Sequence, residues 1–308
     1  MNDTAPLKYS DSFNWIATPD GHQLSLRTLG NSSGQRPHAA VLCLHGLFSD
    51  GRFFLNSKQH GPASVLLDHG YQVYVGELRG HGRSKWPSTA RKWNWSFDEY
   101  VQQDIPALLN AVSERHDGPI FVLAHSFAGY ALLVSLGLVS KLHAKVSGVC
   151  LLASAVNNYS ELGLRKRIMF HSAVFLGGLF GYFPARLLRL GVSDEPVNLM
   201  KQFAKWAPKC QFASIQGEID YWQCLGSVTL PVWAGVGAAD RFHASVRRGR
   251  YLLERLGSAD KKFVEVGMNS GFSHDFNHVD VLRGSDAERE VLPLLIAWMK
   301  DRAVSHEM

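Results

Sequence analysis

Cysteine is scarce in this chain, with four residues among 308. None of them forms a Cys-x-x-Cys pair, and no cluster of cysteine and histidine has the spacing of zinc ligands. Cys43 and Cys150 lie inside apolar runs, where a free thiol packs like a small hydrophobic side chain. The sequence therefore predicts no disulfide framework and no bound metal, and we expect no cofactor.

The sequence also shows neither the pattern typical of a targeting segment nor a concentrated charge. Its first residues, MNDTAPLKYSDSFNW, have no basic stretch followed by an apolar one, so we expect no signal peptide and a cytoplasmic location. The net charge of +5 is spread along the chain, and its densest basic run, residues 165–167, is short. A nucleic-acid-binding protein usually gathers its basic residues on one face, so a nucleic-acid partner is not expected.

Internal repeats and low-complexity segments are absent, and short apolar runs instead alternate with longer helical patterns. This alternation is typical of an α/β protein with a mainly parallel sheet and helices on both faces. A hairpin with its turn at Pro19–Gly21 is expected to precede the alternation. Further strands are expected at 39–44, 71–78, 119–125, 146–154, 230–236 and 261–266. Helices are expected at 96–116, 127–143, 243–257 and 286–302.

The alternation breaks once, because no convincing strand occurs between residues 157 and 215. This segment contains an 18-residue run without formal charge, 168–185, which is of borderline length for a membrane span. Its glycines, His171 and Pro184 argue against a span. We therefore expect 157–215 to form a helical cap inserted into one α/β core made of 1–156 and 216–308. Contact of this cap with a membrane surface is a secondary expectation.

The strongest local motif is PIFVLAHSFAGY, in which a buried strand leads into Ser126 and a helical pattern follows at once. This is the strand–turn–helix context of a nucleophile elbow, a sharp turn that exposes the serine hydroxyl. Small residues are needed two positions before and after the serine, and these positions hold Ala124 and Ala128 where glycine is usual. Gly129 follows directly, and its lack of a side chain relieves crowding between the strand and the helix. A serine that only caps a helix would give a similar local pattern.

A second turn predicts where negative charge could be stabilised. The strand that ends at Leu44 is followed by His45-Gly46-Leu47-Phe48. A glycine there lets the backbone turn and leaves the next amide free to point at a developing oxyanion. The backbone amides of Leu47 and Phe127 are therefore the predicted oxyanion hole.

Taken in order, these segments resemble the α/β-hydrolase superfamily. The resemblance is carried by LCLHGLFSDGRFF (42–54), VGELRGHGRS (75–84) and the serine turn at 124–129. SFDEYVQQDIPALLNAV (96–112) and FNHVDVLRGSDAEREV (276–291) are similar to segments of the acid-lipase branch. GYFPARLLRLG (181–191) and the later Lys205-Trp206 look like bacterial predicted hydrolases. The resemblance implies an α/β-hydrolase fold with a serine, an acid and a histidine in that order along the chain.

The acid and the base are assigned through this resemblance. Asp240 stands just past a predicted strand, where the superfamily places a carboxylate that orients the imidazole. Two histidines follow the last strand, His274 and His278. The Asn-His-Val-Asp block matches the His-x-Asp pattern of the acid lipases and favours His278, with His274 kept as the alternative base. Asp280 would then be a structural partner in the same loop.

Together these residues predict a serine hydrolase that cleaves a carboxylic ester through an acyl-enzyme. We expect a small-molecule ester with an apolar part as substrate, and Phe48 and Trp206 are candidates for lining its pocket. Acyl transfer by the same triad is one alternative. The other is a non-catalytic ligand-binding module on the same fold.

Overall fold

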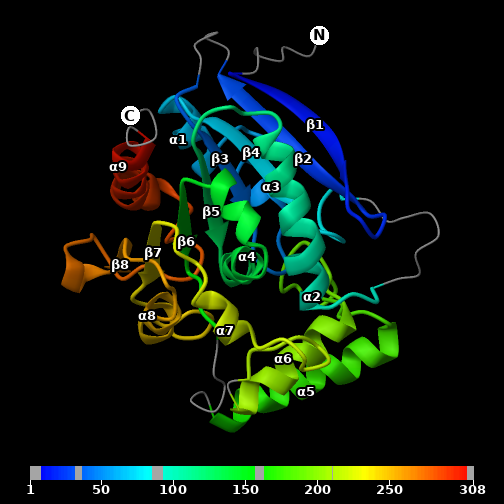
Figure 1. The fold of residues 1–308 in the computed structure, drawn as a ribbon. Coiled ribbons are helices and arrows are strands. Elements are labelled where there is room, and N and C mark those ends of the chain that lie inside the picture. The colour runs from blue at the N-terminus through cyan, green and yellow to red at the C-terminus, as the bar shows by residue number, and fades with distance from the viewer. Residues whose placement is uncertain (1–7, 32–36, 85–92, 157–162, 210, 304–308) are drawn as a thin grey trace, which may run out of the picture.

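A computed structural model describes residues 8–31, 37–84, 93–156, 163–209 and 211–303. Its centre is an eight-stranded sheet in the order β1-β2-β4-β3-β5-β6-β7-β8 (Figure 1). Strand β2 pairs antiparallel with both of its neighbours, β1 and β4, and all pairs among β3 to β8 are parallel. The strands are β1 (Tyr9–Ala17), β2 (Gln23–Asn31), β3 (Ala40–Leu44), β4 (Gln72–Glu77), β5 (Ile120–His125), β6 (Gly148–Leu152), β7 (Val232–Gly237) and β8 (Lys261–Val266). This confirms the predicted mainly parallel α/β architecture.

The central strands are largely apolar, as is typical of strands that helices cover on both faces. Along β3, Leu42 and Leu44 face one core cluster while Val41 and Cys43 face the other, as the two-residue period of a strand requires. One face packs against α3 (Ile105–Ser113), α4 (Phe127–Leu138) and α8 (Val246–Glu254). The other packs against α1 (Pro62–Asp68) and α9 (Leu292–Ala303), so helices cover both faces as predicted (Figure 1).

Two of the predicted helices are interrupted, and in both a proline stands just after the break. Residues 96–116 form α2 (Phe97–Glu99), a π-helical turn and then α3, whose second residue is Pro106. Residues 287–291 form another π turn before Pro293 in α9. A proline has no N–H to donate to the carbonyl four residues earlier. The backbone hydrogen bonds just before it therefore change from the α-helical to the π-helical pattern. Ser96 begins the first helix with a capping box, in which its side chain and that of Glu99 each accept a backbone N–H.

The segment between β6 and β7 is helical and contributes no strand to the sheet. Helices α5 (Gly163–Phe180) and α6 (Val197–Lys209) pack side by side below the sheet in Figure 1, and α7 (Tyr221–Leu225) leads back to it. Among the described residues, no helix is long and apolar enough to cross a membrane. Residues 157–162 and 210 of the predicted cap lie outside the described residues. The division into core and cap stays a prediction, and "cap" below means 163–215.

Candidate active site

Ser126 sits in a strained turn between β5 and α4. Its φ of 57° is a conformation that costs a residue with a side chain about 1–3 kcal/mol. The turn is tied to the sheet because the Ser126 N–H donates to the carbonyl of Leu152 at 2.8 Å. Ala124 and Ala128 are fully buried, as expected for the two crowded positions on either side of the serine. This turn therefore places the serine hydroxyl beyond the carboxyl end of β5.

The closest packing at this turn involves two glycines. A Cβ on Gly129 would lie 2.0 Å from the Oγ of Ser154, whose hydroxyl donates to the Ser126 carbonyl at 2.9 Å. A Cβ on Gly46 would lie 3.0 Å from the Cβ of Ser126. The helix therefore meets the end of β6 at Gly129, one residue beyond the position at which the usual motif has its second glycine.

The structure brings Ser126, His278 and Asp240 together in one hydrogen-bonded row. His278 Nε2 lies 2.9 Å from Ser126 Oγ, and His278 Nδ1 lies 2.5 Å from Asp240 Oδ2. Burial alone would raise the pKa of Asp240, but hydrogen bonding to His278 and its charge lower it below the usual value. Asp240 is therefore an ionised acceptor that holds the proton of His278 on Nδ1 and leaves Nε2 to accept the serine proton.

A further histidine, which the sequence analysis missed, supports this row from behind. His125 is buried, and its Nε2–H donates to the backbone carbonyl of His278 at 2.8 Å. Its ring stacks on Phe53 with centroids 4.5 Å apart. Burial, together with the nearby His278, lowers the pKa of His125 to about 3, so the ring is neutral. A histidine at the end of a buried strand carries no sequence signal for this role.

The alternative base lies elsewhere. His274 stacks on Phe276 with ring centroids 4.0 Å apart, and its nitrogens lie 3.9 Å from carboxylate oxygens of Asp280 and Asp286. Its side chain is 39% exposed. Of the two candidates, His278 is the one that the fold brings to Ser126.

The two predicted oxyanion-hole amides are free to bind a substrate oxygen. Within the described part of the chain, neither the Leu47 nor the Phe127 N–H donates a hydrogen bond to a protein acceptor. Phe127 is also the first residue of α4, so the positive end of the helix dipole lies beside its amide. Both groups belong to residues that, like Ser126, line one cavity. The arrangement can stabilise negative charge on an oxygen next to the serine.

That cavity is apolar and has a volume of about 350 Å³. The core contributes Ser126, the two oxyanion-hole residues and Phe48, which lies in the lining as expected. Much of the remaining wall comes from the cap and is formed by Met169, Phe170, Ala173, Leu176, Phe183, Leu188, Leu190, Met200 and Phe203. A cavity with one reactive polar end and long apolar walls suits an ester with a hydrocarbon part.

Trp206 does not line this cavity, which corrects the expectation from sequence. Its ring lies behind Phe203, with centroids 5.4 Å apart, and packs edge-on against Phe97 and Phe212. Its indole N–H donates to the carbonyl of Ala213 at 2.8 Å. The tryptophan therefore anchors α6 to the core, and its apolar area is used in that packing.

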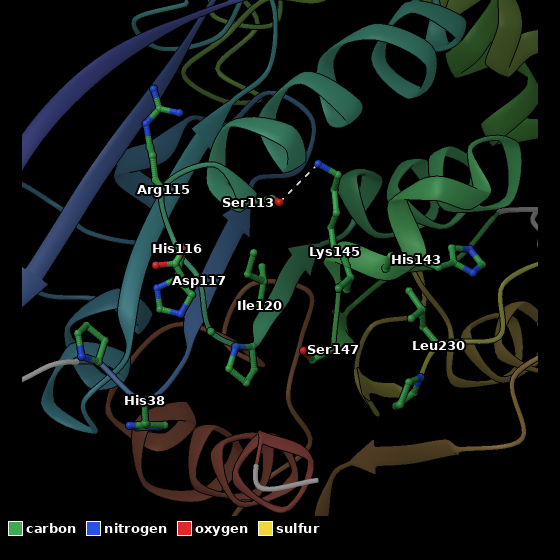
Figure 2. Close-up of a pocket in the computed structure, with 16 residues that line it drawn as sticks. His38, Ser113, Arg115, His116, Asp117, Ile120, His143, Lys145, Ser147 and Leu230 are labelled. Carbon is green, nitrogen blue, oxygen red and sulfur yellow. Dashed lines mark hydrogen bonds between the residues drawn. The ribbon is translucent and has the colours of Figure 1, made fainter. Parts of the chain in front are cut away.

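A larger depression of about 1200 Å³ lies at the opposite edge of the sheet (Figure 2). It is bordered by Ile120, the first residue of β5, and by Ser147 and Pro231, which precede β6 and β7. Its walls carry polar side chains such as Lys145, whose ammonium donates to Ser113. Ligands of open parallel sheets bind outside the carboxyl ends of the strands, so the cavity at Ser126 is the candidate active site.

Comparison with known proteins agrees with this geometry. A family model described as serine aminopeptidase, S33, matches residues 35–276, which is most of the chain. The chain belongs to this family of α/β-hydrolases. The resemblance to serine hydrolases of that fold is thereby confirmed. The match ends two residues before His278.

Sequence relatives of this chain include lipases. Triacylglycerol lipase 1 of Arabidopsis thaliana is 33% identical over 129 residues, which cover 39% of this chain and 33% of the lipase. The tear acid lipase-like protein of Mesocricetus auratus is 31% identical over 147 residues, covering 44% of this chain and 37% of that protein. The matched part thus spans about a third of the length of these relatives.

The fold is shared with solved hydrolase structures. An esterase from Pyrococcus furiosus superposes with a TM-score of 0.63 at 17% identity, covering 98% of this chain and 96% of the esterase. At that identity the likeness concerns the fold alone. It shows that this chain has the α/β-hydrolase fold of that esterase.

The close approach at Gly46 generates a first prediction. Changing Gly46→Ala puts a methyl group 3.0 Å from Ser126 Cβ and 3.2 Å from His125 Nδ1, so these neighbours must move by a few tenths of an ångström. Misplacement by about 1 Å can cost about 100-fold in rate. We expect a fluorophosphonate to label Ser126 about 10-fold to 100-fold more slowly, measured by mass spectrometry. The control is Gly178→Ala on α5, where nothing lies within 4 Å of the added methyl group. Equal labelling of both variants at the wild-type rate would contradict the packing argument.

Proposed function

We propose that this protein is a carboxylic ester hydrolase whose catalytic residues are Ser126, His278 and Asp240. The observation that carries the proposal is the row of hydrogen bonds from Asp240 through His278 to Ser126, which ends at the apolar cavity. The lipase relatives support ester cleavage as the chemistry. No cofactor takes part in the proposed reaction.

The proposed reaction proceeds in two halves. His278 Nε2 takes the hydroxyl proton of Ser126 as Oγ attacks the acyl carbonyl, and the carbonyl oxygen becomes an oxyanion held by the amides of Leu47 and Phe127. Collapse of this intermediate expels the alcohol, which takes the proton from His278 and leaves an acyl-serine. Water then attacks the acyl-serine with His278 as base, which releases the acid and restores the hydroxyl. Asp240 keeps the imidazole in the required tautomer and stabilises the imidazolium.

The triad predicts a large loss of turnover when its nucleophile is removed. We expect Ser126→Ala to lower kcat for p-nitrophenyl esters by about 10⁴-fold or more, since residual catalysis would come from binding and the oxyanion hole alone. Asp240→Asn should lower kcat by about 10⁴-fold, since the imidazole then adopts the wrong tautomer. Thermal unfolding and circular dichroism check that both variants fold.

The two alternatives have their own outcomes in this experiment. If wild-type protein neither hydrolyses esters nor takes up a fluorophosphonate at Ser126, the protein is a binding module and the proposal is overturned. If the acyl-enzyme forms but turns over only when an alcohol or amine is added, the protein is an acyltransferase. We expect water alone to suffice, with a burst of alcohol release that matches the enzyme concentration.

The lining of the cavity favours a substrate whose acyl or alcohol group is an apolar chain of moderate length. Its cap wall is formed almost entirely by hydrocarbon and aromatic side chains, and the burial of each methylene of a chain is worth about 0.8 kcal/mol. We therefore propose esters with an apolar chain as the substrate class, with kcat/KM rising with chain length until the cavity is full.

Filling the cavity should change this preference selectively. Ala173 is nearly buried and lies in the cap wall, so Ala173→Trp occupies space that a chain would use. We expect kcat/KM for p-nitrophenyl decanoate to fall by about tenfold or more while that for the acetate stays within about twofold. The matched control is Leu187→Trp, which adds bulk at a cap position that is 71% exposed. If Ala173→Trp lowers kcat/KM by the same factor for both esters, the cavity does not hold the apolar chain of the substrate.

The outer surface of the cap supports contact with a membrane. Six large apolar side chains are each at least half exposed there: Ile168, Phe175, Leu179, Leu187, Leu190 and Val192. Between residues 163 and 193 the chain has five lysines and arginines and no acidic residue, so this segment carries positive charge. Leu190 also lines the active-site cavity, so the exposed apolar surface is continuous with it. We propose that the cap lies on an anionic bilayer, whose negative headgroups attract its positive charge.

Vesicle binding tests this contact. We expect wild-type protein to sediment with phosphatidylcholine–phosphatidylglycerol vesicles, more weakly with phosphatidylcholine alone and at high salt. Changing Phe175→Ser together with Leu179→Ser should weaken binding by about tenfold or more. The matched control is Met268→Ser, which removes an exposed apolar side chain outside the cap. Unchanged sedimentation of the double variant, or self-association through the same surface, would exclude the bilayer as the partner.

A further inference from the structure

A carboxylate of the cap is buried directly behind the proposed oxyanion hole. Glu195 lies between α5 and α6 in the sequence and is fully buried. Its Oε1 accepts the backbone N–H of Phe48 at 2.8 Å, and the same oxygen lies 3.0 Å from Nε2 of His81. Residues from the turn after β3, the loop after β4 and the cap thus meet at one oxygen atom.

His81, which faces this carboxylate, has a hydrogen-bond acceptor at each of its ring nitrogens. The second ring nitrogen of His81, Nδ1, lies 2.9 Å from the carbonyl of Arg79. A carbonyl and a carboxylate both accept hydrogen bonds, so an imidazolium satisfies both contacts. Burial would lower the pKa of His81, but the charge and hydrogen bond of Glu195 raise it above its usual value. The two acceptors and the raised pKa thus both favour an imidazolium at His81, and the Phe48 N–H shares the Glu195 oxygen with it.

The cap also binds the backbone carbonyl of Phe48. The Phe48 carbonyl accepts the N–H groups of Val192 at 2.7 Å and Ser193 at 3.1 Å. Gly191 makes this approach feasible, since a Cβ there would lie 2.2 Å from the Phe48 oxygen. Phe48 itself has a φ of 58°, which a residue with a side chain adopts only when its surroundings hold it there. Glu195 and its neighbours supply that restraint.

These contacts restrain the backbone on one side of the Leu47 amide, and His45 restrains the other. His45 Nδ1 lies 2.9 Å from the carbonyl of Gly46, which belongs to the same peptide group as the Leu47 N–H. Burial and the nearby His81 lower the pKa of His45 to about 3, so the ring is neutral and its Nδ1–H donates. The peptide before Leu47 is thus held by His45, and the peptide after it by Glu195.

We propose that Glu195 is a positioning residue that keeps the Leu47 amide aimed at the oxyanion, acting through its hydrogen bond to Phe48. This rests on the proposed ester-hydrolase function. Glu195 touches neither Ser126 nor the cavity, so its effect passes through the backbone of the turn. The oxyanion hole is complete only when the cap is seated on the core.

The test compares variants at two adjacent acidic residues of the cap. Glu195→Ala removes the acceptor for the Phe48 N–H, whereas Glu195→Gln keeps an acceptor oxygen and loses the charge. Asp194→Ala is the matched control, because Asp194 is also buried but binds Arg186 within the cap. The readouts are kcat and KM for a p-nitrophenyl ester and the inhibition constant of an alkyl trifluoromethyl ketone, whose tetrahedral adduct places an oxyanion in the hole.

We expect Glu195→Ala to lower kcat by about 100-fold, as loss of one oxyanion donor does, with KM within about threefold. The inhibition constant of the ketone should rise by a similar factor. Glu195→Gln should recover most of the activity, and Asp194→Ala should stay close to wild type. If Glu195→Ala does not fold, Gly191→Ala displaces the Phe48 carbonyl without removing a charge and should give the same split between kcat and KM.

Equal losses in the Glu195→Ala and Asp194→Ala variants, or a change in KM alone, would overturn the positioning role. So would wild-type ketone affinity in a folded Glu195→Ala variant. Labelling of wild-type Ser126 by a fluorophosphonate, measured first, separates this result from failure of the proposed function. If the wild-type serine is inert, the hydrolase proposal itself falls.

Discussion

The active-site geometry depends on the backbone of Ser126, which is held at a φ that a serine does not adopt by itself. Its N–H is bound to the end of β6, and its carbonyl accepts the hydroxyl of Ser154. Relaxation of the turn would break both hydrogen bonds and move the serine away from His278. The sheet and α4 together therefore supply the energy that keeps the hydroxyl exposed at the edge of the cavity.

The cap has two connected roles in this arrangement. It forms most of the apolar wall of the cavity, and it holds the turn that carries Phe48 through Glu195 and the backbone of Val192 and Ser193. A buried carboxylate is stable there because His81 faces it and a backbone N–H binds it. Substrate shape and the alignment of the Leu47 amide are thus coupled through one inserted segment.

Local patterns were sufficient to predict much of the fold. Consecutive apolar residues marked the buried strands, because a parallel sheet covered on both faces has no polar side. The sharp turn at Ser126 was visible in the small residues on both sides of it. The helix breaks near Pro106 and Pro293 were missed, although both prolines are visible in the sequence, because a helical period continues across them. The exclusion of Trp206 from the cavity depended on how α6 packs, which no local pattern encodes.

The sequence by itself determined the order of the elements, the turn that carries the serine, and the residue types from which a triad could form. It left two histidines four positions apart as candidate bases, since distance along the chain does not say which way a loop faces. Only the tertiary structure decided between them, by setting His278 between Ser126 and Asp240 and sending His274 to the surface. It also joined Glu195, His81 and Phe48, which are far apart in the chain. Such contacts form only when the cap folds back onto the core, so their partners carry no shared signal in the sequence.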